Sequence, residues 1–340
     1  MESISQKLLP WFHENRRDLP WRTDRDPYKV WVSEIMLQQT QVDTVIPYYN
    51  RFIAKFPTLQ ALAEATDEEV LKLWEGLGYY SRVRNLHSAV REVSREYGGV
   101  VPDEKEEISR LKGVGPYTAG AILSLAYGKP EPAVDGNVMR VITRLFAMED
   151  DITKSATRAK IENIVQQLIP ADEPGAFNEA LMELGALICK PRDPACEHCP
   201  VVDQCMAREA GVHEQLPVKK KNKPVRPVSL VCGVVMKEDR VLVRRRPAQG
   251  LLAGMWEFPT SENTDVSSLL SEQRIEWESR VGTVTHVFSH VKWIVNVYKG
   301  NINSDEQDSL PQHYHWVEPK ALANYTFPKV FHKVRQLVGI

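Results

Sequence analysis

Four of the five cysteines in this 340-residue chain lie within seventeen residues, with the spacing Cys-x6-Cys-x2-Cys-x5-Cys. They are Cys189, Cys196, Cys199 and Cys205. Thiols this close together in a large chain indicate a metal site rather than a disulfide framework. Structural zinc sites usually combine two short Cys pairs, whereas iron–sulfur clusters accept irregular spacing and favour a Cys-Pro step, as at Cys199-Pro200. The spacing therefore favours a 4Fe–4S cluster held by a loop over 189–205, with zinc as the alternative.

The spacing of apolar residues indicates that the first part of the chain is helical. From Ser3 to about Ala210, apolar residues such as Leu59 and Leu62 recur at steps of three and four. At 340 residues the chain exceeds the size at which one hydrophobic core keeps growing, so two domains are expected. We therefore predict an all-helical domain over residues 1–215.

A basic, proline-containing stretch over 216–228 follows, and this composition predicts an extended, solvated linker. Beyond it the apolar period changes to two, and the next residues read as a β-hairpin. Residues 281–298 predict two more strands, broken near Ser289, and residues 328–338 predict a final helix. The second domain is therefore expected to be an α+β domain over 229–340.

The net charge of −2 argues, taken alone, against binding to duplex DNA. The charge is unevenly distributed, however, because residues 219–246 hold ten Lys or Arg against two acidic residues. The longest apolar stretch, 230–236, is too short to cross a bilayer, and residues 1–17 lack the features of a secretory signal. We therefore expect a cytoplasmic protein. Its composition, with 43% hydrophobic and 26% charged residues, is typical of globular proteins and argues against a disordered chain, a collagen or a coiled coil.

Residues 105–128 predict two helices joined by a glycine turn. Gly113 and Gly115 permit positive φ and let the backbone come close to a partner, and Pro116 suits a first helical turn. The free N–H groups of such a helix start form an anion site, which would hold a phosphate without reading sequence. An ordinary helix–helix turn explains the glycines equally well.

Two acidic residues are candidates for catalysis. Glu34 has Val30, Trp31 and Leu37 at helical spacing, so we expect a buried carboxyl group with a raised pKa, suited to a general acid. The alternative is a carboxylate satisfied by an arginine or a helix end. Asp135 precedes a helical run and is expected to be its N-cap, a role that is compatible with pointing into a pocket. Spacing alone does not show that the two residues meet.

Taken in order, these features make the chain resemble the helix–hairpin–helix DNA glycosylases that carry an iron–sulfur cluster. Within them it is similar to the branch that removes adenine mispaired with 8-oxoguanine. The resemblance covers nearly the whole length. It includes Asp-Leu-Pro-Trp-Arg at 18–22, Glu-Ile-Met-Leu-Gln-Gln-Thr-Gln-Val at 34–42, Gly-Leu-Gly-Tyr-Tyr-Ser-Arg at 76–82, Asp-Gly-Asn-Val at 135–138 and Gly-Met-Trp-Glu-Phe-Pro at 254–259.

The resemblance implies a role for each candidate at the reacting bond. Glu34 matches the acid that protonates the flipped adenine. Asp135 matches the carboxylate that stabilises the oxocarbenium-like sugar, either electrostatically or through a transient covalent bond. Tyr117 and Asn137 match polar residues that line the same site, and Arg22 matches a residue near the adenine pocket.

The resemblance also implies the DNA contacts and the cofactor. Gln39 and Tyr79 match residues that wedge into the duplex and support base extrusion, and Thr40 and Leu77 belong to the same DNA-binding set. The glycines of the 105–128 hairpin are expected to contact phosphate. The four clustered cysteines match the ligands of the 4Fe–4S cluster.

One departure from the wider superfamily concerns the reaction type. Relatives that also cut the DNA strand carry a nucleophilic lysine where this chain has Tyr117, so no Schiff base is expected at that position. Lys112, on the other side of the glycine turn, is too remote to substitute. A monofunctional glycosylase that leaves an abasic site is expected.

The C-terminal domain resembles the Nudix fold, but the acidic Nudix box is absent. Residues 268–275 offer too few carboxylates for a hydrolytic Mg²⁺ site. Lesion recognition is the expected role, and Phe288, Ser289 and His290 match the family's loop that senses 8-oxoguanine. For Phe288 and His290 the alternative is core packing at a strand break.

The sequence thus predicts a monofunctional glycosylase, acting as a monomer on double-stranded DNA that contains adenine opposite 8-oxoguanine or guanine. Three alternatives remain: a sibling glycosylase with another target base, a DNA-lesion-binding protein without catalysis, and a nucleotide-pool Nudix hydrolase. The intact Glu34 and Asp135 argue against the second, and the missing box argues against the third.

Overall fold

The computed structural model describes residues 3–220, 224–262, 265–302, 310 and 313–340. The chain divides into two compact units, residues 3–70 with 81–220, and residues 71–80 with the described residues from 224 onward. Residues 71–80 thus group with the second unit, although the sequence pattern placed them in the helical domain. The predicted boundaries at 215 and 229 stay predictions, and residues 221–223 of the basic linker lie outside the described part of the chain.

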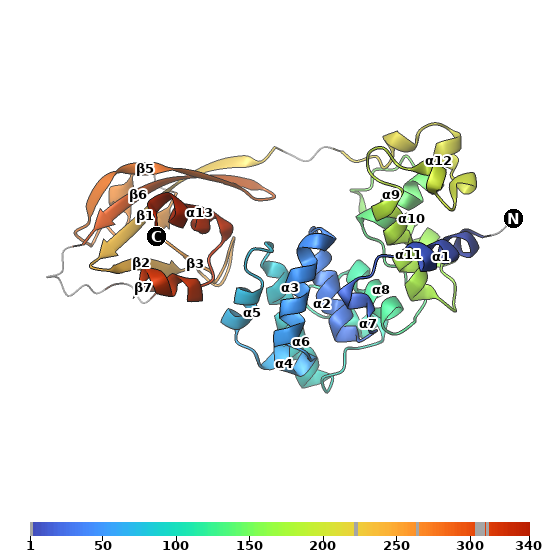
Figure 1. Ribbon diagram of the computed structural model, residues 1–340, viewed down its shortest axis with the longest axis horizontal. Helices are drawn as coiled ribbons and strands as arrows, with labels where there is room; N and C mark the ends of the chain where they lie inside the picture. Colours follow the sequence, from blue (N-terminus) through green and yellow to red (C-terminus); the bar gives the residue numbers. More distant parts are fainter. Residues whose placement is uncertain (1–2, 221–223, 263–264, 303–309, 311–312) are drawn as a thin grey trace. The chain divides into compact units, whose positions relative to one another are not determined.

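The first unit is helical, as predicted, and contains most of the helices in Figure 1. Its helices are α1 (Ile4–Asn15), α2 (Pro27–Leu37), α3 (Val42–Lys55), α4 (Leu59–Glu64), α6 (Ser81–Glu96), α7 (Lys105–Ile108), α8 (Pro116–Leu125), α9 (Gly136–Leu145), α10 (Ser155–Leu168), α11 (Pro174–Leu187) and α12 (Met206–Glu209). A further helix, α5 (Asp67–Leu73), spans the division between the units.

One hydrophobic core of this unit lies where α1, α9, α10 and α11 meet. Phe12, Ile142, Ile161 and Phe177 are completely buried there. Burying each such side chain contributes about 1.5–3 kcal/mol to folding. Helix α11 approaches α9 closely at Gly185, where an added Cβ would lie 2.7 Å from the Cβ of Asn137. This core therefore fixes the first turn of α9, which follows Asp135.

The predicted glycine hairpin is formed by α7, the turn after it and α8. Gly113 has φ +82°, and a Cβ there would lie 2.7 Å from the Cβ of Asn85 on α6. Gly115, by contrast, has φ −94° and ψ 178°, an extended conformation that does not require a glycine. The reason is that Gly115 is the N-cap of α8, a position that takes extended backbone, and Pro116 follows at N1. Nothing lies within 4 Å of a Cβ placed on Gly115, so its backbone stays open to a partner.

The second unit is built on a seven-stranded sheet with the order β3-β2-β1-β6-β5, in which β4 also pairs with β1 and β7 with β2. The strands are β1 (Arg226–Lys237), β2 (Arg240–Arg245), β3 (Trp256–Glu257), β4 (Thr260–Ser261), β5 (Glu276–Val287), β6 (Val291–Asn301) and β7 (Tyr314–Val317). The predicted hairpin is confirmed as β1 and β2, and the two strands broken near Ser289 as β5 and β6. The final helix, α13 (Lys329–Val338), is also confirmed and packs on β5 (Figure 1).

Strand β1 begins at Arg226, so residues 226–228 of the predicted linker belong to a strand. Residues 226–228 pair in parallel with Val291, Lys292 and Trp293 of β6. Pro227 is compatible with this strand, because a proline lacks a backbone N–H but can still occupy the first residues of a strand. Across the described residues, no helix is both long enough and apolar enough to span a membrane.

Candidate active site

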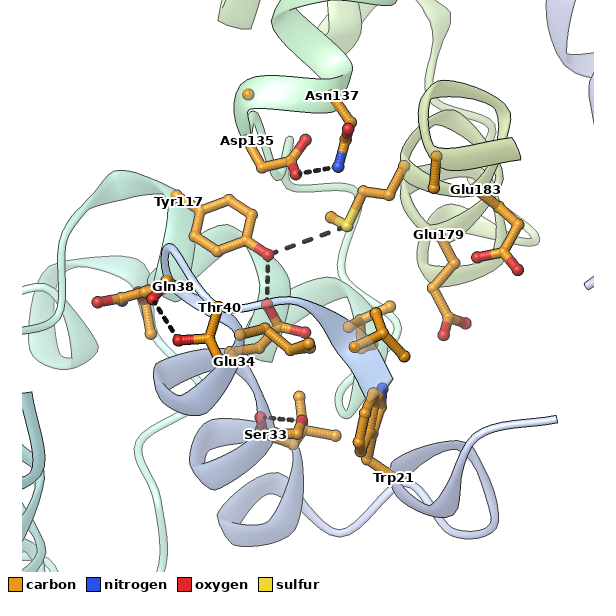
Figure 2. Close-up of a pocket in the computed structure, with 18 of the residues that line it drawn as sticks. Trp21, Ser33, Glu34, Gln38, Thr40, Tyr117, Asp135, Asn137, Glu179 and Glu183 are labelled. Atoms are coloured by element: carbon orange, nitrogen blue, oxygen red, sulfur yellow. Dashed lines mark hydrogen bonds between the residues drawn. The ribbon is translucent and has the colours of Figure 1, made fainter. Parts of the chain in front are cut away.

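The first unit contains a cavity of about 960 Å³ lined mainly by residues of α2, α8, α9 and α11 and of the loops next to them. Figure 2 shows how side chains from these distant segments converge. Of the residues predicted from sequence, the cavity brings together Arg22, Glu34, Gln39, Thr40, Gly113, Gly115, Tyr117, Asp135 and Asn137. Glu34 and Asp135 therefore do line one cavity, which spacing could not show.

Glu34 lies in the last turn of α2, a helix capped at its start by Asp26, whose carboxylate accepts from the backbone N–H of Lys29 at 3.0 Å. Glu34 is only 4% exposed. Burial raises the pKa of Glu34 to about 7, assisted by the charges of Asp135 and Glu179 and opposed by a hydrogen bond that the Tyr117 hydroxyl donates (Figure 2). The predicted burial and raised pKa are confirmed, and a large fraction of Glu34 is protonated at neutral pH.

Asp135 is the N-cap of α9, as predicted, and also lines the cavity. One carboxylate oxygen accepts from the backbone N–H of Val138 at 2.7 Å, and the other accepts from the side-chain amide of Asn137 at 2.9 Å (Figure 2). Burial raises the pKa of Asp135, while these hydrogen bonds oppose the rise by favouring the charged form. In this cavity burial therefore favours the protonated form of Glu34, whereas two hydrogen-bond donors stabilise the carboxylate form of Asp135.

Arg22 is held by two glutamates that sequence reasoning missed. Its guanidinium donates to Glu179 at 2.8 Å and to Glu183 at 3.1 Å, and also to the backbone carbonyl of Arg17 at 2.8 Å. Burial raises the pKa of Glu183, but hydrogen bonds from Arg17 and Arg22 outweigh it and lower that pKa to about 2. Two glutamates four residues apart on the mostly apolar helix α11 were the signal that could have found them.

Helix α9 connects the cavity to the cysteine loop. Arg140 donates to the side-chain oxygen of Asn137 at 2.8 Å and to the backbone carbonyl of Cys189, also at 2.8 Å. One turn further along, Arg144 donates to the sulfur of Cys189 at 3.3 Å and to the carbonyl of Lys190 at 2.7 Å. Arg140 and Arg144 are both buried. Their hydrogen bonds tie α9 to Asn137 beside the cavity and to the backbone and sulfur of the cysteine loop.

The four clustered cysteines are half-buried and line one cavity together with Arg144, Arg208 and His213. Among the described residues, no three His, Cys, Asp or Glu side chains are grouped so that they could hold a metal ion. Four sulfurs around one cavity, with arginines beside them, match in number and kind the ligands that an iron–sulfur cluster requires.

The remaining predicted residues lie in the second unit and do not line the cavity. Leu77 and Tyr79 belong to its 71–80 segment, in which Tyr79 is 46% exposed. The ring of Phe288 packs on those of His286 and Trp293, with centroids 4.6 and 5.0 Å apart, so the packing alternative describes Phe288. Ser289 and His290 are exposed in the turn between β5 and β6, where the Ser289 hydroxyl lies 3.3 Å from Nδ1 of His290.

Comparison with known proteins places this geometry in a family. Residues 32–167 match the model of the HhH-GPD superfamily of base excision DNA repair proteins, and residues 231–337 match the NUDIX domain. The adenine DNA glycosylase of Mus musculus is 38% identical over 98% of this chain and 77% of its own length. That of Buchnera aphidicola subsp. Schizaphis graminum is 31% identical over 98% of both chains.

Among solved structures, a thermostable thymine-DNA glycosylase is similar to 60% of this chain and covers 94% of its own, with 33% identity and a TM-score of 0.55. An endonuclease III–DNA covalent intermediate matches 61% of this chain, with 25% identity and a TM-score of 0.52. The predicted fold class, a helix–hairpin–helix glycosylase domain followed by a Nudix-like domain, is confirmed. The adenine-specific relatives extend over both domains, and the chain belongs to the adenine DNA glycosylases of the HhH-GPD superfamily.

Proposed function

We propose that the protein hydrolyses the N-glycosidic bond of adenine mispaired with 8-oxoguanine, or with guanine, in duplex DNA. The observation that carries the proposal is the pairing of Glu34 and Asp135 in one cavity, where burial raises the pKa of Glu34 to about 7 and two hydrogen bonds favour the charged form of Asp135. Two carboxyl groups with separated protonation states are what cleavage of a glycosidic bond requires.

In this mechanism Glu34 acts first, as the general acid. A protonated Glu34 donates its proton to the extruded adenine, so that the base leaves as a neutral molecule. Tyr117 orients the carboxyl group of Glu34 through the hydrogen bond between them. Because burial holds the pKa of Glu34 at about 7, the acid form is available at the pH of the cell.

Asp135 acts on the sugar. As adenine leaves, positive charge develops on the deoxyribose, and the carboxylate of Asp135 stabilises it, either through space or by a transient bond. Asn137 and the backbone N–H of Val138 hold the Asp135 carboxylate in one orientation. Water then completes the hydrolysis and leaves an abasic site.

The absence of a suitable amine supports a monofunctional reaction. Among the described residues that line the cavity, none is a lysine, so none can form a Schiff base with the sugar. Strand cleavage is therefore not part of the proposed activity.

The cofactor of the proposal is a 4Fe–4S cluster held by Cys189, Cys196, Cys199 and Cys205. The irregular spacing, the four thiols that line one cavity and the arginine donor at Cys189 support it. When bound, the cluster supplies a covalent anchor for the 189–205 loop and a redox-active centre. Iron and sulfide analysis of the purified protein, with thiolate-to-iron absorbance, tests the assignment, and stoichiometric zinc instead would overturn it.

We assign recognition of 8-oxoguanine to the second unit, through Ser289 and His290. Their exposure in the β5–β6 turn leaves both side chains accessible to a base. Glu257 cannot serve a Nudix metal site there, because it is completely buried and its carboxylate accepts from Arg244 at 2.6 Å and from Arg246 at 2.5 Å. The proposal thus includes no nucleotide hydrolysis. The protein of this proposal is a cytoplasmic monomer that associates with the nucleoid through DNA.

A single-turnover assay tests the proposal directly. Duplexes carry adenine opposite 8-oxoguanine, guanine or thymine, and a further duplex carries thymine opposite guanine. We expect excision of adenine opposite 8-oxoguanine and guanine only, with strand breaks seen only after alkali. Breaks without alkali would contradict the monofunctional reaction, and preferred removal of thymine would contradict the substrate.

A further inference from the structure

One arginine outside the predicted site holds the end of the helix that carries Glu34. Arg82, the second residue of α6, is half-buried and donates from Nη1 to the backbone carbonyls of Ile35 at 2.9 Å and Met36 at 3.0 Å. The same nitrogen donates to the carbonyl of Gln38, and Nη2 donates to the Thr40 hydroxyl at 3.3 Å. One guanidinium therefore contacts four points between Ile35 and Thr40 as the chain leaves α2, with the two hydrogens of Nη1 shared among three carbonyls.

These bonds answer a requirement of the helix itself. The last four carbonyls of a helix have no partner within the helix, and a cation at the C-terminus is favourable. An arginine suits this position better than a lysine, because its planar group donates in several fixed directions. Helix α2 has no basic residue in its last turn, so Arg82 supplies the cation from another helix.

The residue enclosed by these contacts is Gln39. It has φ +58°, a left-handed backbone that a glutamine adopts only when its surroundings impose it, and its side chain is exposed at the rim of the cavity. Arg82 binds both of its neighbours, Gln38 and Thr40. The side chain of Gln38 is held on its other side by the buried hydroxyl of Thr118, at 3.3 Å.

We propose that Arg82 is a positioning residue that sets the Gln38–Thr40 turn so that Gln39 is presented for insertion into the duplex. This inference rests on the proposed function. Arg82 acts on extrusion of the adenine nucleotide rather than on cleavage of the bond. Nη1 and Nη2 donate to α2, Gln38 and Thr40, so these contacts hold the turn and do not bind a phosphate.

The chain offers a matched control on the same helix. Arg91 also caps another helix, donating to the carbonyls of Ala63 at 3.1 Å and Ala65 at 2.7 Å at the end of α4. It also pairs with Asp67 at 3.1 Å. Arg91 does not line the cavity. Both Arg82→Lys and Arg91→Lys thus remove arginine hydrogen bonds from the end of a helix. The helix end held by Arg82, that of α2, leads to the cavity rim, whereas the end of α4 held by Arg91 does not.

The experiment measures two steps in each variant, on duplexes with adenine opposite 8-oxoguanine and 2-aminopurine beside the adenine. The rise in 2-aminopurine fluorescence reports extrusion, and product formation with enzyme in excess reports excision. For Arg82→Lys we expect both rate constants to fall about tenfold or more while the amplitude stays that of the wild type, because a misplaced wedge slows the step without unfolding the protein. Arg91→Lys should change neither rate.

Three outcomes would overturn the inference while the wild type still excises adenine. The first is equal rates for Arg82→Lys and Arg91→Lys. The second is a lower amplitude of Arg82→Lys with an unchanged rate constant. The third is a smaller salt dependence of duplex binding by Arg82→Lys, which would indicate that Arg82 contacts a phosphate. A wild type that excises no adenine would instead contradict the proposed function. Thr40→Val supplies a milder variant: it removes one hydroxyl, should slow extrusion less than Arg82→Lys, and should add little in the double variant.

Discussion

The cavity of the first unit and the β5–β6 turn of the second unit are built in opposite ways. In the cavity Glu34 is buried, Asp135 accepts two hydrogen bonds, and Arg22 is held by two glutamates. In the turn Ser289 and His290 are exposed and contact chiefly each other. Under the proposed function, this difference means that bond cleavage would depend on groups fixed before the substrate arrives, whereas lesion reading would depend on groups left available to it.

The largest effect should come from removing the acid. Glu34→Gln keeps the shape of the side chain but cannot donate the proton, so we expect single-turnover excision to fall about 10²- to 10⁴-fold. Binding to the mispaired duplex should change little. Quenched-flow kinetics alongside a binding titration measure both quantities. Excision at the wild-type rate would remove Glu34 from the mechanism and break the contrast between the two regions.

The next largest effect concerns the stability of the cavity wall. Glu183→Gln removes a buried charge that pairs with Arg17 and Arg22, and we expect the free energy of unfolding to fall by about 3 kcal/mol. Because the pKa of Glu183 is lowered to about 2, its contribution is present above the ordinary carboxyl pKa and is lost as the pH falls towards 2. Denaturant unfolding at pH 7 and pH 3 measures it.

Glu173→Gln is the control for that variant, because Glu173 starts the same helix and pairs with His13 at the surface at 3.0 Å. An exposed pair of this kind should cost less than about 1 kcal/mol. Equal losses in the two variants would mean that burial of the Glu183 network adds nothing to stability.

A smaller effect is expected in the pH dependence of excision. The rate should fall as the pH rises through about 7, because Glu34 loses its proton there. The hydrogen bond from Tyr117 lowers the pKa of Glu34, so Tyr117→Phe should move this alkaline limb to higher pH. Single-turnover rates between pH 5 and 9 show the shift, and a limb that moves to lower pH would contradict the assigned hydrogen bond.

The smallest effect should follow from changes in the turn. Ser289→Ala should reduce the preference for 8-oxoguanine over guanine by about tenfold or less, since one exposed hydrogen bond is worth about 1 kcal/mol. The rate on adenine opposite guanine should stay that of the wild type. Competition between the two duplexes measures the preference. A loss on both duplexes would mean that the turn serves the chemistry as well as recognition.

Local features of the cavity could be predicted from the sequence. The apolar neighbours of Glu34 predicted its burial, and the position of Asp135 before a helical run predicted its N-cap. Both follow from periodicity within one element. The resemblance of ordered motifs then supplied roles that no single pattern contains.

Contacts between distant elements could not be predicted in the same way. Arg22 meets Glu179 across 157 positions, and Arg82 meets Gln38 across 44. Such pairs are determined by how helices pack, and neither partner carries a local sign of the other. The backbone of Gly115 shows a related limit, because a glycine permits a positive φ without requiring it.

Gly185 illustrates what this dependence on packing means for sequence variation. It does not line the cavity, yet its missing side chain lets α11 lie against Asn137. Even an alanine there would press on the residue that orients Asp135. A survey that ranks inherited substitutions by their distance from DNA, or by the mildness of the exchange, would pass over this position.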